Sequence, residues 1–177
     1  MSIAVMHEVV HHLKQLDRPG REDKWKARLS TEQATRVEKM LGYTTWATFV
    51  STTAATFAMR NDPLMRPPSR EKPPLCEGVH GEHWFPYPRR QPSVVAHSAC
   101  HLHFLGRLFE ICYNISEYLF TKDDKKTFTQ DVLQDLQTDL ALWYESLIGC
   151  LNIVDNIKSP HTLSIQYVCT VILGTGS

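Results

Sequence analysis

Apolar residues between positions 128 and 147 recur at the interval of an α-helix, and this spacing constrains the fold more than any other feature of the sequence. They are Phe128, Val132, Leu136, Leu140, Trp143 and Leu147, separated by steps of 4, 4, 4, 3 and 4. Such steps place side chains on one face of a helix, and that face must be buried against another element. Thr127 and Gln130 have the spacing of a capping box, so we expect a helix from about 127 to Gly149.

Four further segments have helical spacing, over about 3–16, 31–60, 93–121 and 159–173. The apolar stripes of the first three are Val5, Val9, Leu13 and Leu16; then Val37, Leu41, Ala47, Val50, Ala54, Phe57 and Ala58; then Leu105, Leu108, Phe109, Cys112, Ile115 and Leu119. No segment shows sustained alternation with a period of two. The sequence therefore predicts an all-α fold of about five amphipathic helices in a single domain over residues 1–177.

Capping residues support the expected helix boundaries. Ser30 with Gln33 forms a capping box before the second helix, Ser93 is a candidate N-cap of the third, and Ser159 before Pro160 opens the last. The first helix is expected to end at residues 17–20, Asp-Arg-Pro-Gly, and the last at Gly174.

A proline-rich arm separates the second and third helices. Seven of the ten prolines fall between positions 62 and 91, where they remove backbone donors and prevent regular helix. We expect residues 61–92 to form an extended loop, with Trp84, Phe85 and Tyr87 fixing its distal end on the helices.

Charge and hydropathy exclude several classes of protein. Nineteen Lys and Arg balance nineteen Asp and Glu, so the chain lacks the basic field on which DNA binding depends. The N-terminus has neither the basic region nor the apolar run of a signal peptide. Residues 40–59 carry no charge and have the length of a membrane helix, but six threonines and Ser51 favour a helix packed between others.

The sharpest catalytic motif is His7-Glu8-Val9-Val10-His11, an HExxH sequence on an expected helix. In zinc hydrolases the two imidazoles bind the metal and the glutamate is the general base. Asp17 stands where an extended motif has its third ligand, but Lys14 replaces the glycine of that motif. Because the chain has no strand-like segment beside this helix, we favour an ordinary polar face and keep the zinc hydrolase as the least favoured of three hypotheses.

Other clusters of reactive residue types have structural explanations. His97, His101 and His103 with Cys100 contain one i, i+4 pair and no evident third ligand, so we expect hydrogen-bonded histidines. The five cysteines, Cys76, Cys100, Cys112, Cys150 and Cys169, form no C-x-x-C pair, and those among apolar neighbours are expected to be small core residues. The carboxylates Asp131, Asp135, Asp139 and Glu145 are expected on a solvated helix face.

Nucleotide chemistry and nucleophilic catalysis have no motif here, because the G-x-S-x-G, P-loop and dinucleotide-binding patterns do not occur. Residues 84–90 interleave aromatic and basic side chains, as single-strand nucleic-acid sites do, but we interpret them as an anchored loop. We assign no catalytic, cofactor-binding or metal residue.

Several motifs together resemble a known family. Residues 46–49 resemble a W-x-x-F helix core, residues 65–68 a loop containing R-P-P, and residues 83–88 the segment before the next helix. Residues 140–147 and 159–165 resemble an L-x-x-W-Y-x-S-L-P helix and a P-H-x-L-x-L-H helix. In this order they resemble the fungal-specific transcription factor domain, the helical middle homology region of zinc binuclear-cluster regulators, over about residues 30–173.

The resemblance implies a nuclear regulatory domain that acts through protein or effector contacts. It also implies a fragment truncated at both ends, because the six-cysteine zinc cluster and its coiled coil are absent, so that zinc and DNA binding would belong to that missing module. The expected partners are other proteins or other domains of the same regulator, and no membrane. An exposed apolar surface of the last helix, formed by Ile165, Val168, Val171 and Ile172, would favour self-association. A free-standing helical interaction scaffold is the alternative.

Overall fold

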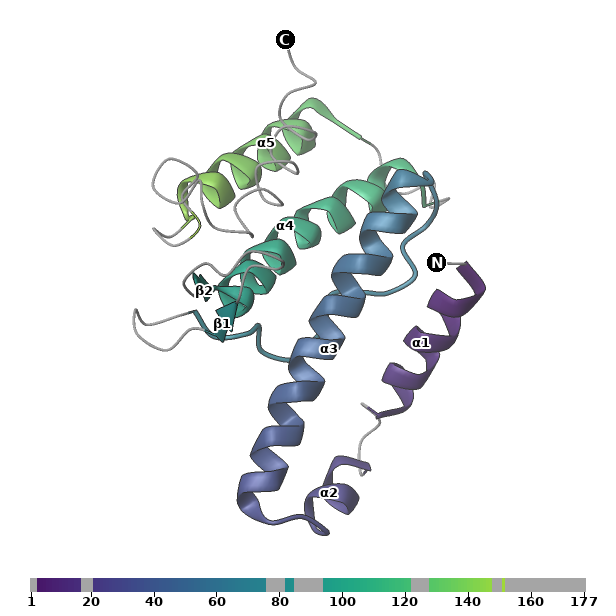
Figure 1. Ribbon diagram of the computed structural model, residues 1–177. Helices are drawn as coiled ribbons and strands as arrows, with labels where there is room; N and C mark the ends of the chain where they lie inside the picture. The colour runs from purple at the N-terminus through teal and green to yellow at the C-terminus, as the bar shows by residue number, and fades with distance from the viewer. Residues whose placement is uncertain are drawn as a thin grey trace, which may run out of the picture.

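The computed structural model describes residues 3–16, 21–75, 82–84, 94–121, 128–147 and Leu151. These residues form helices α1 (Ile3–Leu16), α2 (Arg21–Lys26), α3 (Thr31–Ala58), α4 (Ser98–Leu119) and α5 (Gln130–Glu145), with a small ribbon of β1 (Glu82–Trp84) and β2 (Val94–Ala96) (Figure 1). The prediction of an all-α fold is confirmed. The expected last helix, 159–173, lies outside the described residues, and the short helix α2 was not anticipated.

Helix α3 begins where the sequence predicts and contacts α1, α2 and α4. Ser30 is its N-cap, and the reciprocal bonds with Gln33 complete the capping box. Arg60 ends the helix region with a φ of 55°, in the left-handed conformation that commonly follows a helix. The amide of Asn61 then donates to the carbonyl of Thr56 at 2.9 Å, which satisfies a group at the helix end.

The buried face of α3 differs from the apolar stripe expected from the sequence. The buried residues are Thr45, Trp46, Phe49, Thr52, Thr53 and Thr56, while Ala47 and Ala58 are exposed. Three of the four buried threonine hydroxyls bond their own helix: Thr45, Thr52 and Thr56 each donate to the carbonyl four residues earlier, at 2.7, 2.8 and 3.0 Å. The hydroxyl of Thr53 is buried without a hydrogen-bond partner. Aromatic and methyl groups therefore form this interface. None of the described helices meets the length and hydropathy required to span a bilayer.

Helix α1 packs through a stripe that, among its described side chains, agrees with the expected one only at Leu13, which is buried as predicted. Met6 and Val10 are buried in place of Val5 and Val9, which are exposed. Val10 joins Trp46 and Phe49 of α3 in one core cluster. The error in the prediction arises because both stripes are apolar, so spacing alone does not choose between them.

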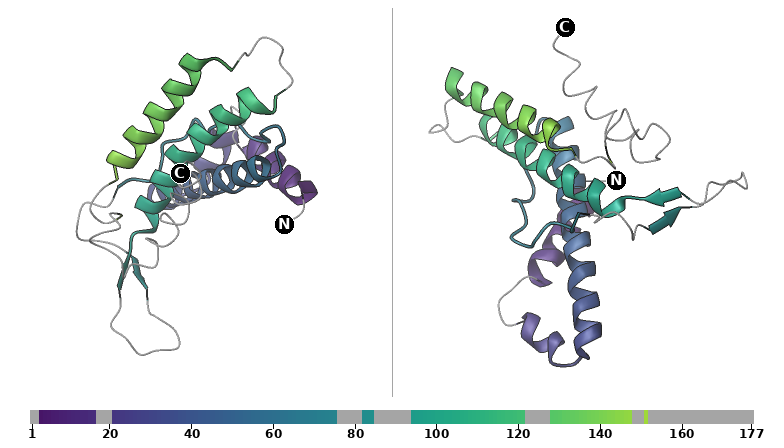
Figure 2. Two further views of the ribbon diagram at one scale, coloured as in Figure 1. Left: turned by 90° about the horizontal axis from the view of Figure 1, so that it is seen from above. Right: turned by 90° about the vertical axis from the view of Figure 1, so that its left-hand side faces the viewer.

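Helix α4 starts at Ser98 rather than at Ser93. Residues Val94–Ala96 are extended instead, because they pair antiparallel with Glu82–Trp84 in the register Trp84 with Val94. His97 is the residue before the helix and makes no side-chain capping bond. Both views in Figure 2 show this ribbon projecting away from the helices. The sequence did not predict this pair of strands, one of which lies within the proline-rich arm and the other directly after it.

Helix α4 lies between α3 and α5 and contributes to both core clusters. Gly106 lets α4 approach α3: a Cβ there would lie 3.0 Å from the six-membered ring of Trp46. On the other side, Phe104 and Leu108 pack with Leu136 and Trp143 of α5. The expected seam is confirmed at Leu108, but Leu119 is exposed.

Helix α5 follows the predicted spacing along α4 (Figure 1). Leu136 and Trp143 are buried, and the indole N–H of Trp143 donates to the carbonyl of Phe104 at 2.8 Å. The helix begins two or three residues later than expected: Thr129 is the N-cap and accepts from the amide of Val132, while Thr127 lies outside the described residues. Phe128 is therefore before the helix and largely exposed.

Candidate interaction site at the strap

Residues 61–75, which we call the strap, run from the end of α3 back across α3 and α4. Met65 is buried with Val10, Trp46 and Phe49. The indole N–H of Trp46 donates to two strap carbonyls, those of Arg70 and Glu71, at 3.1 Å each. The ring Nδ1 of His103 on α4 lies 2.7 Å from the carbonyl of Pro73. The strap is therefore fixed at its start, its middle and its end.

Lys72 links the strap to both helices. Its ammonium nitrogen lies 4.6 Å from the centre of the Trp46 ring on α3, in cation–π contact. The same nitrogen is 2.8 Å from Oε1 of Glu110 on α4. The two side chains are 24% and 32% exposed, so water screens this pair less than it screens a fully exposed one. Lys72 thus connects three segments: the strap that carries it, α3 and α4.

Two hollows lie beside the strap. The first, which we call the α3 hollow, has a volume of about 280 Å³ between α3 and strap residues 70–74, and Lys39, Gly42 and Tyr43 form its helical wall. The second, of about 530 Å³, lies between strap residues 62–69, Lys14 of α1 and Tyr113, Glu117 and Thr121 of α4. Both mix charged, aromatic and proline surfaces.

Gly42 forms part of the helical wall of the α3 hollow. Gly42 sits within α3, and a Cβ built there would be 4.0 Å from the carbonyl oxygen of Glu71, an ordinary contact. A longer side chain at this position would extend into the space between helix and strap. Lys39 is held beside Tyr43, with its nitrogen 5.9 Å from the ring centre. The hollow therefore presents a cation and an aromatic ring on one wall.

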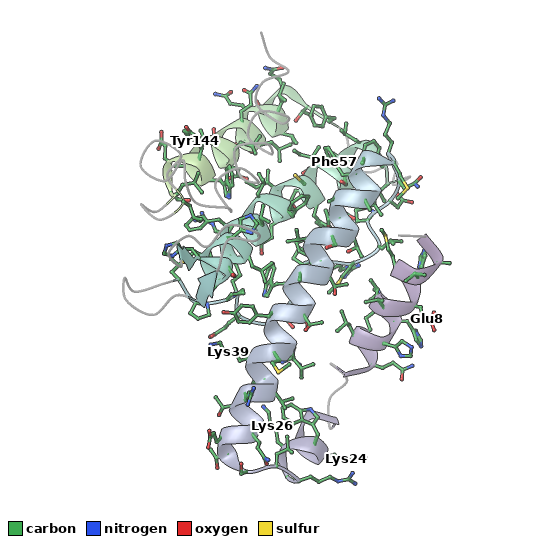
Figure 3. All side chains as sticks on the ribbon, in the orientation of Figure 1. Glu8, Lys24, Lys26, Lys39, Phe57 and Tyr144 are labelled. Atoms are coloured by element: carbon green, nitrogen blue, oxygen red, sulfur yellow. The ribbon has the colours of Figure 1, made fainter. Side chains whose placement is uncertain are left out.

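The HExxH residues lie on the solvent face of α1. His7, Glu8 and His11 are all exposed, and Glu8 projects from the side of α1 away from α3 (Figure 3). His11 Nε2 lies 2.7 Å from the Gln15 side-chain amide, and His12 Nε2 lies 3.9 Å from Glu8 Oε1. Asp17, the candidate third ligand, is outside the described residues. In the part of the chain that the structure describes, no three His, Cys, Asp or Glu side chains are grouped to hold a metal ion.

The second histidine cluster is divided among different environments. Cys100 is fully buried, His97 precedes α4, and His103 is bonded to the strap. Cys112 is also buried, and desolvation raises the pKa of its thiol from 9.0 to about 12. Both described cysteines are thus core residues, as the sequence indicates for Cys112. Cys76, Cys150 and Cys169 lie outside the described residues.

The structure describes some of the remaining predicted features and leaves others outside its described residues. Of the aromatic–basic stretch 84–90, only Trp84 is described, as the last residue of β1. Asp131, Asp135, Asp139 and Glu145 are exposed on α5, as expected of a solvated face. The anchoring of residues 61–75 was not predicted from the sequence. A signal for it was present, because Met65 is an isolated apolar residue among prolines and Trp46 is a large polar-tipped ring on a helix rich in threonine.

The described residues thus form a set of packed helices with two hollows beside a fixed strap. A comparison with curated proteins agrees in kind: the chain is similar to the notoamide biosynthesis transcriptional activator notL' of Aspergillus versicolor, with 29% identity over 154 residues. The matched region is 82% of this chain and 24% of that protein. The similarity supports a relationship to fungal transcription factors.

The chain spans about a quarter of the length of this relative, so the similarity concerns one region of a longer protein. No family model matches the chain, and no solved structure matches it.

Proposed function

We propose that this chain is the middle homology region of a fungal transcription factor and regulates transcription in the nucleus through protein or effector contacts, without a DNA-binding cluster of its own. The observation that carries the proposal is the similarity to a transcriptional activator along 82% of the chain. The role as an activator is stated of that relative, and we extend only regulation of transcription to this chain.

The placement of the family-like motifs supports the proposal. Trp46 and Phe49, from the W-x-x-F motif, are 1% and 0% exposed and pack against the strap and α4. Arg66, Pro67 and Pro68, from the R-P-P motif, belong to the strap. Trp143, from the L-x-x-W-Y-x-S-L-P motif, is buried against α4. The described motifs thus hold helices and strap together, which supports a fold shared with that family and leaves the function to be argued from the site.

Within this function, the α3 hollow is the contact site that we favour. It is open to solvent beside a segment held by Trp46 and Lys72, so that an occupant would touch both α3 and the strap. Contact with two elements at once allows a bound partner to favour one arrangement of the strap over another.

The function is tested by tethering the chain to a heterologous DNA-binding domain in an Aspergillus host and measuring expression of a reporter gene. We expect expression to differ from that of the DNA-binding domain alone, and an untethered fluorescent fusion to accumulate in the nucleus. Unchanged reporter expression, with the tethered chain present and folded, would overturn the proposal and favour the interaction scaffold.

The contact site is tested in the same assay with two substitutions at one position. Gly42→Leu fills the α3 hollow and should remove the effect on the reporter. Gly42→Ala adds only a methyl group at ordinary contact distance, so it should preserve the effect. Equal activity of both variants would place the contact elsewhere. Glu8→Gln should leave the effect intact, because Glu8 lies on the solvent face of α1.

A further inference from the structure

The solvent face of α1 carries two imidazoles one helical turn apart. His7 and His11 occupy positions i and i+4, and both side chains are exposed. Side chains with this spacing start about 5–6 Å apart at their Cβ atoms and lie on the same face. A first-row metal ion binds imidazole nitrogen at about 2.0–2.1 Å, so one ion can bridge such a pair without moving the helix.

Helix α1 has little stabilisation of its own. It is 14 residues long and has no acidic residue in its first turn. Three of its residues are valines, which are weak helix formers. Isolated helices of this length are marginal in water, so α1 depends on Met6, Val10 and Leu13, which are buried while both histidines are exposed. A bridge between His7 and His11 would therefore stabilise α1 without competing with its packing.

We propose that His7 and His11 form a two-imidazole binding site for a first-row transition-metal ion, with water in the remaining coordination positions. Imidazole suits copper, nickel and zinc, and a site that imposes no geometry follows the general affinity order, in which Cu²⁺ exceeds Ni²⁺ and Ni²⁺ exceeds Co²⁺. This inference goes beyond the proposed regulatory function and does not depend on it.

The neighbours of the pair define how it differs from a hydrolytic zinc site. A catalytic zinc ion has three protein ligands, and the described residues hold no group of three suitable side chains. The Gln15 amide lies 2.7 Å from Nε2 of His11 and must rotate away when a metal binds. Gln15 lies near the end of α1 and is only half-buried, so this rotation displaces no core contact.

The test is calorimetric titration of the full, metal-free chain with CuCl₂, NiCl₂ and CoCl₂, with far-ultraviolet circular dichroism recorded at each step. We expect one ion per chain in the order Cu²⁺, Ni²⁺, Co²⁺, and a rise in helical signal on binding. His7→Gln and His11→Gln should each weaken Ni²⁺ binding at least about tenfold, which corresponds to about 1.4 kcal/mol.

His12→Gln is the matched control, because it removes a neighbouring exposed imidazole and leaves the pair intact. Its Ni²⁺ affinity should stay within about twofold of that of the unsubstituted chain, a difference of about 0.4 kcal/mol. Unchanged binding in His7→Gln, an equal loss in His12→Gln, or a different order among the three ions would each overturn the proposal. Circular dichroism of the metal-free variants verifies that each remains folded.

Discussion

Replacing Gly106 with alanine tests whether the strap makes the contact of α3 with α4 rigid. A Cβ at Gly106 would lie 3.0 Å from Cε3 and 3.2 Å from Cζ3 of Trp46, closer than side chains normally approach. The ring cannot easily retreat: its N–H is bonded to two strap carbonyls, Lys72 lies over its face, and Phe49 packs edge-on at 5.7 Å. We therefore expect Gly106→Ala to destabilise the chain, although alanine is the better helix former.

The magnitude follows from two opposing contributions. Alanine inside a helix is favoured over glycine by about 1 kcal/mol. Overpacking a well-packed core costs about 1–3 kcal/mol, which we take as about 2 kcal/mol because the ring is held on several sides. The free energy of unfolding should therefore fall by about 1 kcal/mol in Gly106→Ala. In a Trp46→Leu background the close contact with the ring is absent. Gly106→Ala should then raise the free energy of unfolding by about 1 kcal/mol.

The assay is urea denaturation followed by far-ultraviolet circular dichroism for the chain, both single variants and the double variant. The expected coupling between the two positions is about 2 kcal/mol, within the range of contacting residues. Gly42→Ala is the matched control, since it has no close neighbour and should stabilise the chain by about 0.5–1 kcal/mol. If Gly106→Ala is stabilising to the same extent in both backgrounds, the ring is free to move and the reasoning about the strap is refuted.

Three further substitutions test the anchoring, the capping and the burial described above. Met65→Ala should lower the free energy of unfolding by about 2–5 kcal/mol, because it opens a cavity under the strap; a loss below about 1 kcal/mol in urea would mean that Met65 is not a core residue. Ser30→Ala should cost about 1 kcal/mol by thermal unfolding, since it removes the capping bond to Gln33, and no change would contradict the capping box. Burial raises the pKa of Cys112 from 9.0 to about 12, so stability should be full below pH 9 and fall as pH rises toward 12. Cys112→Ala should lose this part of the pH dependence, and parallel curves for the two proteins would count against it.

The sequence predicted the start of α3 from its capping box at Ser30, and it predicted α5 from spacing, although the N-cap of α5 is Thr129. The prediction of the buried face failed where two apolar stripes on the same helix are equally plausible. Val5 and Val9 form as good a stripe as Met6 and Val10, and only the position of Trp46 and Phe49 decides between them. Contacts between segments that are distant in the chain leave no periodic pattern in the sequence, so they could not be predicted from spacing.

The candidate site illustrates the same limit. The α3 hollow depends on the strap lying against α3, which in turn depends on bonds between Trp46 and residues 24 and 25 positions later. The family-like motifs identified several of the residues involved but not their contacts. The strands Glu82–Trp84 and Val94–Ala96 were missed because three residues are too few to show an alternating pattern.

The bonds from Trp46 to the strap end on main-chain oxygens of Arg70 and Glu71, and the same two residues line the α3 hollow. Attachment of the strap to Trp46 therefore depends on no side chain at these two positions. Positions 70 and 71 can accept new side chains, with altered charge or size, while the indole keeps its acceptors. The lining of the α3 hollow can therefore diverge during evolution without loss of the bonds that hold the strap.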